Sequence, residues 1–144
     1  MKNRGTIFVI IARALIVLLL AYTAFSKLLD FKRFSHDIHN QEIFPGLAGI
    51  LVYLLPLSEI AAAFMLLTER TKITGLNISL VLFMVFTGYT VLVVANVFGR
   101  IPCPCGGFLK DVSWNAHLIF NLTFLIINLT ALLIAKKGGT ANKS

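Results

Sequence analysis

The sequence predicts an all-α integral membrane protein, a four-transmembrane-helix bundle with both termini in the cytoplasm. Hydrophobic residues make up 58% of the 144 residues and charged residues only 13%, and the mean hydropathy is +0.87. A soluble domain holds about 45–50% apolar and about 25% charged residues. One small domain cannot hide so much apolar surface from water. The composition therefore argues against a soluble enzyme and against a disordered chain.

Four stretches are long and apolar enough to cross a bilayer, which requires about 20 mostly apolar residues. We expect them at residues 7–25, 47–67, 73–98 and 116–135, within a single membrane domain over residues 1–144. The first stretch begins like a signal peptide, but Arg13 interrupts its apolar core and no clear cleavage site follows. We therefore expect this span to be retained, with the lipid bilayer as the main surroundings of the chain.

The connection at residues 26–46 is longer than the turn at residues 68–72. Within it, Leu28, Phe31, Phe34 and Ile38 recur at steps of three and four residues. This spacing is typical of a short amphipathic helix that lies in the headgroup layer. The alternative is that the first span continues out of the membrane as one helix.

The basic residues predict the orientation of the chain, because short cytoplasmic loops are rich in Lys and Arg. They lie between long apolar stretches and form no continuous stripe, so the net charge of +7 does not indicate nucleic-acid binding. Seven of them fall in the two tails and the tight turn, and five in the other two connections. The seven are Lys2, Arg4, Arg70, Lys72, Lys136, Lys137 and Lys143, and the five are Lys27, Lys32, Arg33, Arg100 and Lys110. This bias predicts an inner-membrane protein whose first and third connections face the periplasm.

Two charged residues, Arg13 and Glu59, fall inside predicted spans, where a charge costs about 2.5–3.5 kcal/mol on insertion scales. Arg13 lies roughly 9–10 Å from the cytoplasmic edge at 1.5 Å per residue. Glu59 lies roughly 12 Å from the same edge of a core of about 30 Å. The similar depths predict an ion pair inside the bundle. We favour a structural clamp over a proton or ligand site, because a paired Arg does not release a proton.

The last span carries a polar stripe, His117, Asn121 and Asn128, whose spacing places the three residues on one helix face. We expect this face to point into the bundle and to bond neighbouring helices. The alternative is a polar cavity for a quinone head group, with His117 and Asn121 as the contacts. In the third span, Gly75 and Ser79 form a small-residue step that suits close helix contact.

The only two cysteines, Cys103 and Cys105, lie together in Ile101-Pro102-Cys103-Pro104-Cys105-Gly106-Gly107. Prolines disfavour helix at the residues before them, and in an extended chain residues i and i+2 point to the same side. The two sulfurs can therefore face each other. A bridge across so small a loop would be strained, and strained disulfides are the labile, catalytic or regulatory ones.

Three interpretations of this cysteine pair remain open. The first is a redox pair that exchanges with thiols of a periplasmic protein, where disulfides persist. The second is a metal site, for which two thiolates would need further ligands such as His36, His39 or His117. The third is an inert structural bridge. Ser113 or Asn115 can begin the last helix close to the pair, and a nearby helix N-terminus lowers a thiol pKa. We favour the redox pair, without metal.

Several short motifs resemble the MauE/DoxX-like group of bacterial four-helix membrane proteins, and the resemblance runs over nearly the whole chain. The most specific is Cys-x-Cys-Gly followed by a Trp-x-x-His-x-x-x-Asn run. In this sequence the motifs are Arg13 with Ala24-Phe25-Ser26-Lys27-Leu28, Leu55-Pro56-Leu57-Ser58-Glu59, Cys103-Pro104-Cys105-Gly106, and Trp114-Asn115-Ala116-His117 with Asn121. Pro104 stands where the MauE proteins have Gly between the cysteines.

The resemblance implies a redox accessory role, with Cys103 and Cys105 as the active pair. MauE proteins are linked to methylamine utilisation, where they are thought to help the disulfide-rich small subunit of methylamine dehydrogenase mature. DoxX-like relatives are associated with quinone-linked oxidation of sulfur compounds, which leaves a membrane quinone open as a cofactor. The alternative function is a non-catalytic DoxX-like subunit or chaperone with a structural cysteine pair. A small transporter has little support, because the chain shows no inverted repeat.

Overall fold

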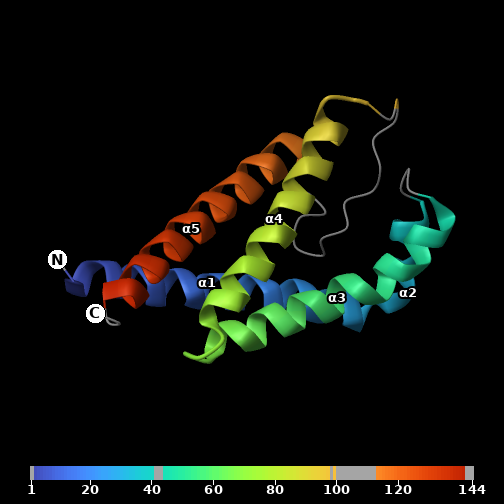
Figure 1. Cartoon of the computed structure of the whole chain (residues 1–144). Helices are drawn as coiled ribbons and strands as arrows, with labels where there is room; N and C mark the ends of the chain where they lie inside the picture. The colour runs from blue at the N-terminus through green and yellow to red at the C-terminus, as the bar shows by residue number, and fades with distance from the viewer. Residues whose placement is uncertain (1, 41–43, 98, 100–112, 142–144) are drawn as a thin grey trace.

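The computed structural model describes residues 2–40, 44–97, 99 and 113–141. These residues form helices only, with no strand among them (Figure 1). The helices are α1 (Lys2–Leu29), α2 (Phe31–His39), α3 (Pro45–Leu67), α4 (Lys72–Val94) and α5 (Trp114–Ala141). Four of them are long and apolar enough to cross a membrane, namely Arg4–Leu29, Pro45–Leu67, Lys72–Val94 and Trp114–Gly139. The predicted all-α fold with four membrane-length helices is confirmed.

Most helices extend beyond the predicted spans, as α1 does to Leu29 and α5 to Ala141, and α4 alone ends earlier than predicted. The third predicted span continues to residue 98, whereas α4 ends at Val94 with Ala95 as its cap. The reason lies in the backbone, because Asn96 adopts a positive φ of 54° and Gly99 a φ of 71°. Asn and Gly are the residues that enter this left-handed region most readily. Residues 95–98 are apolar enough for a span, but the chain leaves the helix there.

The four long helices pack as two antiparallel pairs. The most extensive contacts join α4 to α5 and α1 to α3, and α3–α4 and α1–α5 contacts close the bundle. Figure 1 shows the α4–α5 pair inclined to the α1–α3 pair, with the two chain termini at the same end of the molecule. The tight turn between α3 and α4 explains why these two helices are neighbours.

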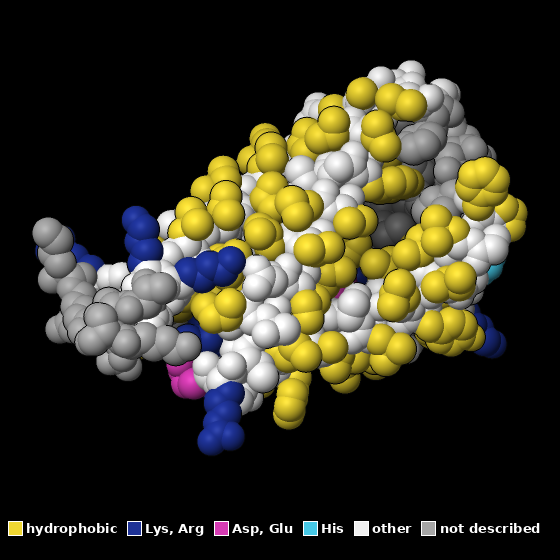
Figure 2. All heavy atoms as spheres, viewed as in Figure 1, with side chains coloured by type: hydrophobic (Ala, Val, Ile, Leu, Met, Phe, Trp, Pro, Cys, Tyr) yellow, Lys and Arg dark blue, Asp and Glu magenta, His cyan; other side chains and the backbone are white. Residues whose placement is uncertain are grey.

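The core lies where the four helices meet and consists of small and branched apolar residues. Ile16 and Leu20 of α1, Leu66 of α3, Leu76 of α4 and Ala131 of α5 are almost completely buried. Large apolar side chains are also exposed on each of the four long helices, and Figure 2 shows many of them on the face in view. Such a surface suits lipid, and Lys and Arg side chains gather mostly at the end that holds the termini.

The short amphipathic helix predicted in the first connection is confirmed as α2. Asp30 separates it from α1, so α1 does not continue as one helix through the connection. Phe34 and Ile38 of α2 are buried against Ala48 and Val52 of α3. The basic residues Lys32 and Arg33 are exposed on the other side. α2 therefore lies over the N-terminal half of α3.

Candidate functional site

The cysteines of the predicted redox pair, Cys103 and Cys105, lie outside the described residues, as does Lys110. Along the chain, their segment joins the end of α4 to the start of α5. Ser113 caps α5, because its hydroxyl accepts a hydrogen bond from the backbone N–H of Ala116 at 3.3 Å. The predicted helix start next to the cysteine segment is therefore in place.

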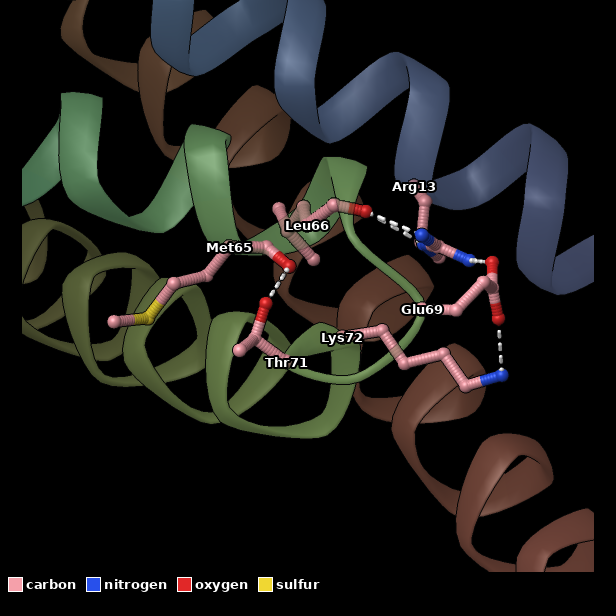
Figure 3. Close-up of polar contacts among 6 residues, drawn as sticks. All are labelled: Arg13, Met65, Leu66, Glu69, Thr71 and Lys72. Atoms are coloured by element: carbon pink, nitrogen blue, oxygen red, sulfur yellow. Dashed lines mark hydrogen bonds and ion pairs between the residues drawn. The ribbon is translucent and has the colours of Figure 1, made fainter.

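The predicted Arg13–Glu59 ion pair is wrong, because the two residues have different partners. Arg13 donates from its Nε to the carbonyl of Leu66 at 2.9 Å and from a second nitrogen to the same oxygen. Its third hydrogen bond goes to the carboxylate of Glu69 in the turn between α3 and α4 (Figure 3). Arg13 therefore caps the C-terminal end of α3 from the neighbouring helix.

This position of Arg13 follows from the unpaired carbonyls at a helix end. The last four carbonyls of a helix have no partner within it, and they carry a partial negative charge. Arg13 satisfies the carbonyl of Leu66, and the hydroxyl of Thr71 donates to the carbonyl of Met65 at 2.8 Å (Figure 3). In a membrane such carbonyls have no water to bond. The partner of Arg13 inside the bundle is therefore the Leu66 carbonyl at the end of α3, and not the Glu59 carboxylate at similar depth.

Glu69 completes the Arg13 cluster at the surface. Its second oxygen accepts a hydrogen bond from Lys72 at 2.7 Å. The hydrogen bonds from Arg13 and then Lys72 lower the pKa of the Glu69 carboxyl to about 2. Because 70% of the Glu69 side chain is exposed, this pairing is largely screened by water. The Arg13 cluster is a structural clamp of the α1, α3 and α4 ends.

Glu59 instead pairs with Lys27 of α1, and both side chains are buried. Lys27 Nζ donates to one carboxylate oxygen, Oε1. The ammonium also lies 5.8 Å from the ring centre of Phe34 in α2 and 5.6 Å from that of Phe86 in α4. Aromatic rings at this distance attract a cation. Four helices therefore supply the surroundings of one buried amine–carboxylate pair.

Sequence reasoning missed Lys27 because it counted this residue as a flank of the first span. The sequence did hold a clue to this pair. A buried Glu59 carboxylate requires a cation, and the Lys27 side chain is long enough to extend several ångströms from its own position on the helix. Estimates of depth that treat each residue as a point on the helix axis leave out this reach. The second oxygen of Glu59, Oε2, is buried and has no hydrogen-bond partner among the described residues.

The polar stripe of α5 bonds to α4, as predicted for a face that points into the bundle. The amide of Asn121 donates to the hydroxyl of Thr90 at 3.2 Å. In the orientation that satisfies both its polar atoms, Asn128 accepts from the Ser79 hydroxyl at 2.7 Å and donates to the Leu76 carbonyl at 3.3 Å. Asn121 and Asn128 are both buried. These amides hold α4 and α5 together.

His117 begins the stripe at the start of α5 and is half-buried. Its ring stacks on that of Trp114, with centres 5.7 Å apart and planes 8° from parallel. His36 and His39 bond within α2 and its cap instead. Within the described ranges, no three His, Cys, Asp or Glu side chains group closely enough to hold a metal ion.

The arrangement therefore contains two buried cations with different chemistry. Arg13 donates three hydrogen bonds at a helix end, whereas Lys27 and Glu59 form an amine–carboxylate pair in the bundle. Neither lies in the part of the chain that carries the cysteines. Helices α3 and α4 also approach each other closely at Gly75, where an added Cβ atom would lie 2.9 Å from the backbone nitrogen of Leu66.

Comparison with known proteins gives one match. Residues 5–134 match the family described as methylamine utilisation protein MauE. This range includes both buried cations, Glu59, the cysteine pair and His117. No curated protein and no solved structure matches the chain.

Proposed function

Because the chain belongs to the methylamine utilisation protein MauE family, we propose that it is a multi-pass redox accessory protein of the bacterial inner membrane. In this proposal, Cys103 and Cys105 exchange disulfides with a periplasmic thiol protein. One observation carries the proposal: the only two cysteines form one Cys-x-Cys motif, inside the family match and between two membrane-length helices. A connection between two such helices lies at the membrane surface, where a partner has access.

The proposed exchange follows ordinary thiol–disulfide chemistry. A thiolate of the partner attacks one sulfur of the Cys103–Cys105 disulfide, that bond breaks, and a mixed disulfide forms. A second partner thiolate then attacks the mixed disulfide and leaves the partner with a new disulfide bond. The Cys pair has gained two electrons, and with two protons it is a dithiol. It returns its electrons to a second thiol protein or to a membrane quinone, and we propose His117 and Asn121 as the quinone contacts.

The orientation belongs to the same proposal. The two termini lie at one end of the molecule, where most Lys and Arg side chains gather (Figures 1 and 2). Cytoplasmic segments are enriched in these residues. Both termini would then be cytoplasmic, and the connection with the cysteines would face the periplasm, where disulfides form and persist.

Trapping of mixed disulfides in cells tests the exchange. Cys103→Ser and Cys105→Ser each remove one sulfur, so an attack by the remaining one cannot be resolved. We expect one of these variants to accumulate a covalent complex that disappears on reduction. A matched control places Ser113→Cys, an exposed position at the start of α5, in the chain without both native cysteines. This control has a thiol on the same connection and is expected to trap nothing.

The same experiment addresses the alternative function, a non-catalytic DoxX-like subunit with a structural cysteine pair. That alternative predicts no trapped partner in either single variant. It also predicts full function of the chain in which both cysteines are Ser. This combined result would rule out the exchange reaction.

A further inference from the structure

The two buried cations differ in how well their hydrogen-bonding capacity is used. Arg13 makes three hydrogen bonds, two of them to the Leu66 carbonyl. Lys27 has three N–H donors, and its partners among the described residues are one oxygen of Glu59 and two aromatic rings. On the other side, Glu59 is 1% exposed and its Oε2 has no partner among the described residues. Within the part of the chain that the structure describes, the Lys27–Glu59 pair is therefore buried and incompletely satisfied.

An incompletely satisfied ion pair in an apolar interior is expensive to keep charged. Movement of one proton from Lys27 Nζ to the Glu59 carboxylate turns both groups neutral without a change of position. Lysine is able to release a proton in this way, whereas arginine stays charged in proteins. The Lys27–Glu59 pair can therefore exist in a charged and a neutral protonation state with the same positions of its atoms. The Arg13 cluster has only the charged state.

One hydroxyl side chain and two aromatic rings are neighbours of the pair among the described residues. Thr23 of α1 lies beside the carboxylate, and its hydroxyl donates to the Leu20 carbonyl at 3.1 Å. α2 and α4 contribute the rings of Phe34 and Phe86. Among the described residues, no charged side chain other than Lys27 is paired with Glu59.

The pair lies on the side of the bundle from which the cysteine segment starts. Phe86, which contacts the Lys27 ammonium, precedes the last residue of α4 by about two helical turns, roughly 12 Å along the axis. After α4 the chain continues into the segment with both cysteines.

We propose that Lys27 and Glu59 form the proton-exchange site for reduction of a membrane quinone by the cysteine pair. This inference rests on the proposed function and selects between its two electron acceptors. Exchange with a second thiol protein needs no net proton, since a dithiol and a disulfide simply trade places. A quinone, in contrast, takes up two electrons and two protons. As the Cys103–Cys105 bond forms, two electrons and two protons leave the thiols, and the Lys27–Glu59 pair passes protons to the quinone oxygens inside the bundle.

A quinone-reduction assay on the full chain in lipid nanodiscs tests this inference. Dithiothreitol supplies electrons, decylubiquinone accepts them, and the rate of the variant without both cysteines is subtracted as background. Lys27→Arg keeps the positive charge and the ion pair but removes the releasable proton. We expect it to lower the rate roughly a hundredfold, the usual contribution of a positioned acid or base. The matched control Arg13→Lys changes the other buried cation and is expected to stay within about twofold of the wild type.

An infrared titration of the same protein measures the site without any electron transfer. Wild type should show a carboxylic-acid C=O band that changes with pH and is absent in Glu59→Gln. A folded Lys27→Arg variant with the wild-type rate would overturn the inference. So would a wild-type spectrum in which no such band depends on Glu59, whatever the folding of the variants.

The outcomes separate this inference from the proposed function. If the cysteines are needed for trapping of a partner but Lys27→Arg reduces quinone normally, the exchange reaction stands and the proton site fails. If the chain without cysteines reduces quinone as well as the wild type and no partner is trapped, the exchange reaction fails first.

Discussion

At the scale of single residues, the buried charges of the described bundle differ in their partners. Arg13 bonds to a helix end and to an exposed carboxylate, and Lys27 bonds to a carboxylate that is almost completely buried. Sequence alone identified Arg13 and Glu59 as charges inside the predicted spans and missed the role of Lys27. It paired Arg13 with Glu59 because it compared depths only, without side-chain reach or helix-end carbonyls.

The Arg13 clamp predicts unequal costs for its two members. Arg13→Ala leaves the Leu66 carbonyl unpaired in the bundle and should lower the free energy of unfolding by about 2–4 kcal/mol. Glu69→Ala removes an exposed partner and should cost less than about 1 kcal/mol. Unfolding in mixed detergent micelles measures both. Equal costs would show that the ion pair, and not the carbonyl contact, is what Arg13 contributes.

The Glu69 carboxyl predicts a small pH dependence of stability. Its pKa is lowered from 4.5 to about 2 in the folded chain, so the unfolded chain binds the proton more readily. The stabilisation from Glu69 is therefore complete above about pH 4.5 and disappears as the pH falls towards 2. The difference in unfolding free energy between wild type and Glu69→Gln should shrink over this window. A difference in unfolding free energy that grows as the pH falls would contradict a lowered pKa of Glu69 in the folded chain.

The Lys27–Glu59 pair predicts strong coupling between its members. Lys27→Met leaves the Glu59 carboxylate buried and unpaired, which should cost about 3–5 kcal/mol of unfolding free energy. Combining it with Glu59→Leu removes both charges and should recover most of that loss. A double-mutant cycle in detergent gives the coupling energy. Additive costs would mean that the two charges do not share one environment.

At the scale of helices, the sequence was sufficient to place the elements but not their exact ends. Apolar length located the four membrane helices, and the three-and-four spacing located α2. Residues 95–98 were assigned to a span because hydropathy does not record the backbone angle of Asn96. The polar stripe of α5 was placed correctly, since Asn121 and Asn128 bond to α4. Cys103 and Cys105 lie beyond the described residues, so their geometry stays a prediction.

The contact between α3 and α4 predicts opposite effects of alanine at two glycines of α4. A Cβ at Gly75 would lie 2.9 Å from the Leu66 nitrogen and 3.0 Å from its Cγ. Gly75→Ala should therefore lower stability by about 1–3 kcal/mol. Gly88 has nothing within 4 Å of an added Cβ, so Gly88→Ala should be neutral or raise stability by up to about 1 kcal/mol through helix propensity. Thermal unfolding in detergent compares the two, and equal effects would contradict the close contact.

At the scale of the whole molecule, the clamp at the α3–α4 turn and the helix ends next to the cysteine segment lie towards opposite ends of the fold. The termini, the Arg13 clamp and Gly75 lie towards one end, and the helix ends that flank the cysteine segment lie towards the other (Figure 1). The buried Lys27–Glu59 pair lies between them. The proposed disulfide exchange and the proposed proton site would therefore lie in different parts of the bundle.

The orientation of the whole molecule predicts which side of the membrane each segment faces. Single cysteines at exposed Arg70 or at Ser113, each in the chain without native cysteines, report this through a membrane-impermeant maleimide added to intact spheroplasts. We expect labelling at position 113 and none at position 70 until the membrane is opened. The reverse pattern would place the native cysteines in the cytoplasm. The proposed exchange would then lose the support of a compartment in which disulfides persist.

The central claim is that Cys103 and Cys105 form an exchanging pair, and their reduction potential tests it most directly. The purified chain in nanodiscs is equilibrated with glutathione or dithiothreitol buffers, and the fraction of alkylated cysteine is measured. We predict a potential between about −300 and −120 mV, the range of proteins that exchange disulfides. A potential below about −300 mV would mark an inert structural bond and would contradict the account.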